Sequence, residues 1–150
     1  MMLAGVAACD PLYTLEVRQA LRPAPAAECV ARAVRHSPLV ADMRPSDRRS
    51  GGETFYVILR DSAGAGAHWN GRVSRDAVGD TAGVLNVGYT WLGYARPGLE
   101  EAVKMEAAAT ALFTELRAAC SPSAPAEAQC IRTGPFYERP CGAGYTAPPQ

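Results

Sequence analysis

The chain has 150 residues, of which 48% are hydrophobic, and this suits one globular domain. Fifteen basic and fifteen acidic residues balance each other. This balance excludes the one-sided charge by which proteins bind nucleic acids or anionic membrane surfaces, so no nucleic-acid partner is expected.

The chain begins with a short apolar run that ends at Cys9. Val6, Ala7, Ala8 and Cys9 place an aliphatic residue three positions before the cysteine, with small residues between. This pattern resembles the lipobox of bacterial lipoproteins. The resemblance implies that a diacylglycerol is attached to the Cys9 sulfur and that the chain is cleaved before it, which makes residues 1–8 the remnant of a signal peptide.

The lipoprotein interpretation predicts where the protein is located in the cell. The mature chain would face the periplasm, anchored in the bacterial cell envelope through Cys9, with the choice between inner and outer membrane left open. Residues 1–8 are uncharged and shorter than a complete leader, so we expect a start codon placed too late or a trimmed leader. The alternative is an ordinary N-terminus that happens to contain Val-Ala-Ala-Cys.

Residues 9–25 contain three prolines, Pro11, Pro23 and Pro25, which favour an extended tether between the membrane and the domain. A short helix or an edge strand over residues 13–21 is the alternative. From Ala26 onward, apolar residues recur at helical spacing until Pro38 and place Cys29 toward the core.

Three strands are predicted next. Residues 44–52 form a polar loop, and residues 54–60 are dense in aromatic and β-branched side chains, as expected for a strand buried on both faces. Residues 68–74 and 84–94 alternate between apolar and polar side chains and indicate half-exposed strands.

The clearest helix spans residues 99–120, with acidic residues in its first turn and Cys120 on its apolar stripe. The expected fold is therefore α+β. A helix, a three-stranded antiparallel meander and a second helix form a two-layer sandwich over residues 26–120. Residues 121–150 are rich in proline and glycine and are expected to form an irregular tail held by a disulfide.

Cysteine parity supports an oxidising compartment. With Cys9 set aside for lipid, four cysteines remain: Cys29, Cys120, Cys130 and Cys141. Because no C-x-x-C spacing occurs, disulfides are favoured over zinc ligation. Four cysteines allow three pairings. We favour Cys29 with Cys120, since both lie on inward helix faces, and Cys130 with Cys141 closing the tail.

No catalytic residue, metal site or cofactor is assigned. Motifs of the G-x-S-x-G, H-E-x-x-H and P-loop kinds are absent from the sequence. His68, Trp69 and Asn70 do not form one site, because strand alternation turns Trp69 away from its neighbours. Glu100 is placed to pair with Lys104 on the surface of its helix.

A partner surface is predicted on the sheet face that the helices leave uncovered. If both helices pack on one face, the apolar residues Tyr56, Ile58, Leu92 and Tyr94 form an exposed patch on the other, unless the tail or the tether covers them. We therefore expect a non-enzymatic, protein-binding or accessory lipoprotein, either a secretion or envelope-assembly component or an immunity protein or inhibitor. The alternative is a small periplasmic enzyme with an unrecognised active site.

Overall fold

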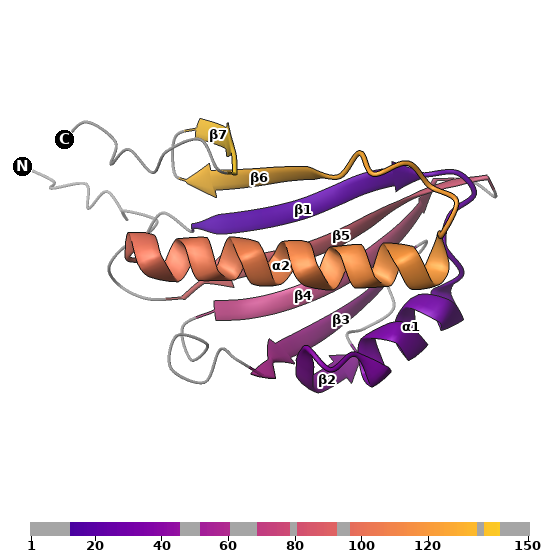
Figure 1. Ribbon diagram of the computed structural model, residues 1–150, viewed down its shortest axis with the longest axis horizontal. Helices are drawn as coiled ribbons and strands as arrows, with labels where there is room; N and C mark the ends of the chain where they lie inside the picture. Colours follow the sequence, from indigo (N-terminus) through magenta and orange to yellow (C-terminus); the bar gives the residue numbers. More distant parts are fainter. Residues whose placement is uncertain are drawn as a thin grey trace, which may run out of the picture.

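A computed structural model of the chain describes residues 13–45, 52–60, 69–78, 81–92, 97–134 and 137–141. These residues form one antiparallel sheet of seven strands with two helices (Figure 1). In chain order the elements are β1 (Thr14–Leu21), α1 (Ala27–His36), β2 (Val40–Pro45), β3 (Gly52–Leu59), β4 (Trp69–Val78), β5 (Ala82–Trp91), α2 (Leu99–Cys120), β6 (Gln129–Gly134) and β7 (Tyr137–Pro140).

The strand order across the sheet is β2-β3-β4-β5-β1-β6-β7. Strands β2 to β5 follow one another as a meander, whereas β1 lies between β5 and β6. Its pairing with β5 runs without a break from Thr14 opposite Thr90 to Leu21 opposite Gly83, and its other side pairs with β6. The first described strand of the chain is therefore an interior strand of the sheet.

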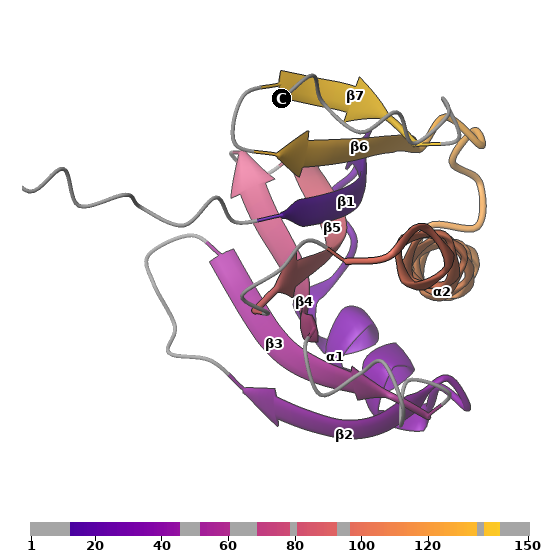
Figure 2. The same ribbon diagram turned by 90° about the vertical axis from the view of Figure 1, so that its left-hand side faces the viewer.

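The sheet is curved, and both helices lie on its concave face (Figure 2). Alternate residues of each interior strand point toward the helices, for example Leu15 and Val17 on β1 and Leu85 and Val87 on β5, all of them buried. The helix α2 crosses this face as predicted over residues 99–120. Its inward stripe is fully buried and consists of Ala102, Met105, Ala109, Leu112, Phe113 and Leu116.

The expected sandwich of helix, three-stranded meander and helix is wrong. The three predicted strands exist as β3, β4 and β5, but the sheet continues beyond them with β2 on one side and β1, β6 and β7 on the other. The strand β3 is also not buried on both faces, because Tyr56 and Ile58 alternate with buried Phe55, Val57 and Leu59.

The strand β1 occupies residues that the prolines had suggested were a tether. Its core-facing series is interrupted by a polar residue, Gln19, which is buried. The Gln19 side-chain amide donates to the Pro125 carbonyl at 2.7 Å, and its oxygen accepts from Arg117 at 3.2 Å. Because both partners lie about a hundred residues away in the chain, local periodicity could not reveal that Gln19 belongs to a core face.

The strand β6 was assigned to an irregular tail for a related reason. Its buried residue Arg132 forms an ion pair with Glu106 of α2, and both side chains are largely shielded from water. A buried arginine is uncommon without such a partner. The strand β2 was missed because it is short, carries Asp42 and Arg44, and has a register shift between Val40 and Asp42.

Candidate functional site

The convex face of the sheet is not covered by either helix (Figure 2). Two apolar side chains of β3 are exposed there, Tyr56 at 44% and Ile58 at 53%. They are exposed because a strand turns successive side chains to opposite faces, and the helices cover only the face that takes Phe55, Val57 and Leu59. This is the face on which the sequence predicted a partner surface.

Tyr56 lies between two arginines on neighbouring strands. Arg44 of β2 and Arg72 of β4 stand opposite Tyr56 in the sheet register, and all three are exposed. Ile58 stands opposite Asp42 of β2 in the same way. The result is an aromatic and an aliphatic side chain within a rim of charged groups, and we call Tyr56, Ile58 and their neighbours Arg44 and Arg72 the outer patch.

An ion pair extends the outer patch toward the middle of the sheet. The Arg72 guanidinium lies 3.7 Å from the Glu16 carboxylate on β1, although β5 separates the two strands. The β5 residue opposite both of them is Gly88, which carries no side chain to stand between them. Arg18 approaches the second Glu16 oxygen at 4.0 Å. Both arginines are half-exposed, so these pairs orient the side chains more than they stabilise the fold.

The other two predicted patch residues do not join this row. Leu92 is 59% exposed but follows the end of β5, two strands from β3. Tyr94 lies outside the described residues. The structure therefore brings together Tyr56 and Ile58, and it adds Arg44 and Arg72, which the sequence analysis had not assigned to the patch.

Both edges of the sheet disfavour the addition of another strand. On β2, the Met43 N–H donates to the Asp42 carboxylate at 2.9 Å, and the second Asp42 oxygen lies 3.4 Å from Arg44. The register shift and the terminal Pro45, which has no N–H, interrupt the edge further. The opposite edge strand, β7, has four residues and ends in Pro140. A partner is therefore expected to bind through faces and not through edges.

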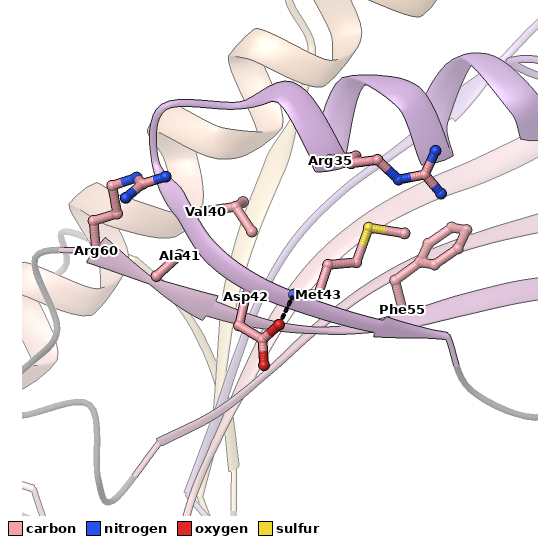
Figure 3. Close-up of a pocket in the computed structure, with 7 residues that line it drawn as sticks. All are labelled: Arg35, Val40, Ala41, Asp42, Met43, Phe55 and Arg60. Atoms are coloured by element: carbon pink, nitrogen blue, oxygen red, sulfur yellow. Dashed lines mark hydrogen bonds between the residues drawn. The ribbon is translucent and has the colours of Figure 1, made fainter.

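A groove of about 360 Å³ lies between α1 and β2 (Figure 3). Its lining includes apolar Val40, Met43 and Phe55, with Arg35 and Arg60 at its two ends, and Asp42. The sequence did not predict this groove because its walls combine α1, the strand predicted over residues 54–60, and β2, for which no strand was predicted. The sequence offered no signal for the groove, because Arg35 and Arg60 are far apart in the chain and come to its two ends only through the packing of α1 against β2.

Buried aromatic side chains gather at the end of the sheet where β1 and β4 begin. Trp69 packs edge-to-face against Tyr13 at 5.6 Å and against Trp91 at 5.1 Å. Trp69 is buried and Asn70 is exposed, as alternation predicted, and His68 lies outside the described residues. Burial raises the pKa of the neighbouring Tyr89 phenol well above its usual range. This cluster belongs to the core.

The cysteines of the described residues form two disulfides. Cys29 at the start of α1 bonds to Cys120 at the end of α2, with 5.7 Å between their Cα atoms, and Cys130 bonds to Cys141. These are the two pairs that the sequence analysis favoured. Cys9 lies outside the described residues, and its lipidation stays a prediction.

The remaining charged and metal-ligating side chains of the described residues do not form a further site. The Lys104 ammonium lies 3.1 Å from the exposed Glu100 carboxylate, the surface pair predicted from their spacing. Among the described residues, no three histidine, cysteine or acidic side chains gather in a way that could hold a metal ion. Within the same part of the chain, neither helix is long and apolar enough to cross a membrane.

No protein-family model matches the sequence, and no match was found among curated protein sequences. Among solved structures, the chain is similar to the di-domain ARO/CYC protein BexL from the BE-7585A biosynthetic pathway, with 13% sequence identity and a TM-score of 0.30. The match covers 75% of this chain and 51% of that protein, so the chain spans about half of its length. A similarity at this level supports no inference about fold or function.

Proposed function

We propose that the chain is a non-enzymatic, protein-binding domain of the bacterial cell envelope that docks its partner on the outer patch. The observation that carries the proposal is the exposure of Tyr56 and Ile58 on a sheet face that neither helix covers, with Arg44 and Arg72 beside Tyr56. Tyrosine and arginine are enriched among the residues that dominate the binding energy of protein interfaces.

The charge around the outer patch favours a partner surface of mixed charge. Arg44 has Asp42 within 3.4 Å, and Arg72 has Glu16 within 3.7 Å, so the rim is close to neutral. Such a rim orients a partner and excludes wrong ones, while the apolar centre supplies affinity. The occupant that fits is a folded protein with apolar side chains surrounded by both acidic and basic groups. A secretion or envelope-assembly component and a toxin are the two candidate kinds of partner.

Two observations support the envelope as the compartment. The bonds Cys29–Cys120 and Cys130–Cys141 belong to oxidising surroundings, because the cytosol keeps thiols reduced. The residues Val6 to Cys9 resemble a lipobox. In this proposal Cys9 carries the lipid that holds the domain at a membrane surface.

Site-specific crosslinking in living cells tests the docking face. A photoreactive phenylalanine analogue replaces Tyr56 or Ile58, and the control position is Val103, which is also 53% exposed but lies on α2. We expect one envelope protein to be captured from both β3 positions and not from Val103. The purified partner should then bind the Tyr56→Ala/Ile58→Ala variant at least about tenfold more weakly than the unchanged chain. Equal capture from Val103, or undiminished binding by the variant, contradicts the proposal.

Metabolic labelling with an alkynyl palmitate analogue tests the anchor separately, on the full chain with its complete leader. We expect label on the unchanged chain and none on Cys9→Ala. Label that persists in Cys9→Ala contradicts the assignment of the lipid site.

A further inference from the structure

We propose that the groove between α1 and β2 is a second docking site, which takes a short segment of a partner protein with an apolar side chain between two acidic ones. The proposal rests on the function proposed above and extends it to the type of segment that is bound. The type of segment is inferred from the order in which chemical groups line the groove. The Arg35 guanidinium lies at one end, apolar side chains follow, and the Arg60 guanidinium lies at the other end (Figure 3).

The apolar part of the groove is already assembled. Val40 and Phe55 are buried in its floor, and Met43 is partly exposed above them. The Met43 and Phe55 side chains point toward the same opening beneath α1 (Figure 3). A methionine adapts its shape to the group it contacts. A space of about 360 Å³ is at the lower end of the range for binding pockets and suits a side chain or two.

The two ends of the groove are positively charged. Arg35 and Arg60 are exposed, and neither guanidinium forms an ion pair with a carboxylate among the described residues. The acid in the groove lining, Asp42, is already engaged by the Met43 N–H and by Arg44. As far as the described residues go, the groove therefore presents two cations that no carboxylate pairs with, and carboxylates are the side chains that arginine binds with good geometry.

The edge of β2 determines how such a segment binds. Since the Met43 N–H is occupied by Asp42 and Pro45 offers no donor, a peptide gains little by adding to β2 as a strand. Side-chain contacts then decide the specificity. The groove also lies next to the outer patch, because Asp42 lines the groove and stands opposite Ile58. One partner can therefore contact both surfaces around β2.

Peptide titration on the full chain with its disulfides intact tests the site without the partner. The probes are acetylated, amidated pentapeptides: Glu-Ala-Leu-Ala-Glu, and two controls in which glutamine replaces both glutamates or serine replaces leucine. NMR follows the Met43 methyl group and the Nε–H groups of Arg35 and Arg60. We expect the acidic peptide to shift all three signals with a Kd on the order of 1 mM, and each control to bind about tenfold more weakly.

Variants sharpen the test. Arg35→Gln and Arg60→Gln should each weaken the acidic peptide at least about threefold, whereas Arg32→Gln, an exposed arginine of the same helix outside the groove, should leave it unchanged. Raising the salt concentration should also weaken binding. Spectra of the free variants report whether each one keeps its fold.

Several results would overturn the proposal. If the glutamine peptide binds as tightly as the acidic peptide, the two arginines do not contribute through their charge. If the serine peptide or inorganic phosphate binds as tightly as the acidic peptide, the groove is an anion site that does not recognise an apolar side chain. Concentration-dependent dimerisation that Arg35→Gln abolishes would assign the groove to a second copy of the chain. The crosslinking experiment at Tyr56 and Ile58 is independent of these outcomes, so a failure here can be told apart from a failure of the proposed function.

Discussion

The two disulfides should contribute unequally to stability, and the difference follows from the loops they close. Cys29–Cys120 joins residues 91 positions apart and Cys130–Cys141 joins residues 11 positions apart. In the chain-entropy model the longer loop stabilises the folded state by about 4.6 kcal/mol and the shorter one by about 2.8 kcal/mol. Removing the first bond should therefore cost about 1.8 kcal/mol more than removing the second.

The position of each bond in the fold widens this difference. Cys29–Cys120 joins the two helices that cover the core, so its effect is felt only when the whole domain unfolds. Cys130–Cys141 ties the end of β7 to β6 at the margin of the sheet, where local fraying relieves part of the constraint. Removing Cys130–Cys141 should therefore lower the measured free energy of unfolding by about 3 kcal/mol or less.

The assay compares two double variants, Cys29→Ala/Cys120→Ala and Cys130→Ala/Cys141→Ala, by urea unfolding. Trp69 and Trp91 are buried and become exposed when the core opens, so their fluorescence reports global unfolding. The first variant should also melt about 10 to 15 °C below the unchanged protein. An equal loss in the two variants, or a larger loss in the second, would refute the loop-closure reasoning.

Three further predictions concern single features of the fold. Glu106→Leu removes the carboxylate that pairs with Arg132 and should lower the free energy of unfolding by about 3 to 5 kcal/mol. The double variant Glu106→Leu/Arg132→Met should lower it less. A double-mutant cycle that shows no coupling between the two positions would contradict this. Because burial raises the pKa of Tyr89 in the folded state, the unfolded chain loses this proton first, and stability should fall above about pH 10 by up to about 1.4 kcal/mol per pH unit. Tyr89→Phe should make that fall shallower in urea titrations, and an unchanged slope would argue against it. Asp42→Val/Pro45→Thr should open the β2 edge and produce concentration-dependent association in light scattering, whereas a variant that stays monomeric would show that other features protect the edge.

Apolar spacing along the chain was enough to predict the elements whose pattern is local. The helix over residues 99–120 and the alternation of β4 and β5 follow from apolar spacing, because each apolar side chain there meets the core directly. The inward helix faces favoured the Cys29–Cys120 pair among the three possible pairings, and Cys130–Cys141 was the pair that remained. The exposure of Tyr56 and Ile58 was expected only on the condition that both helices cover one face of the sheet, because the apolar run over residues 54–60 had suggested a strand buried on both faces.

The extent of the sheet and the existence of the groove depend on contacts between distant parts of the chain. Gln19 and Arg132 occupy core-facing positions on β1 and β6, and each is acceptable there because a polar partner reaches it from a distant part of the chain. A local pattern cannot show such partners, so both strands looked irregular in the sequence. The groove also depends on contacts between separate parts of the chain, since Arg35 and Arg60 flank one apolar surface only after α1 packs against β2.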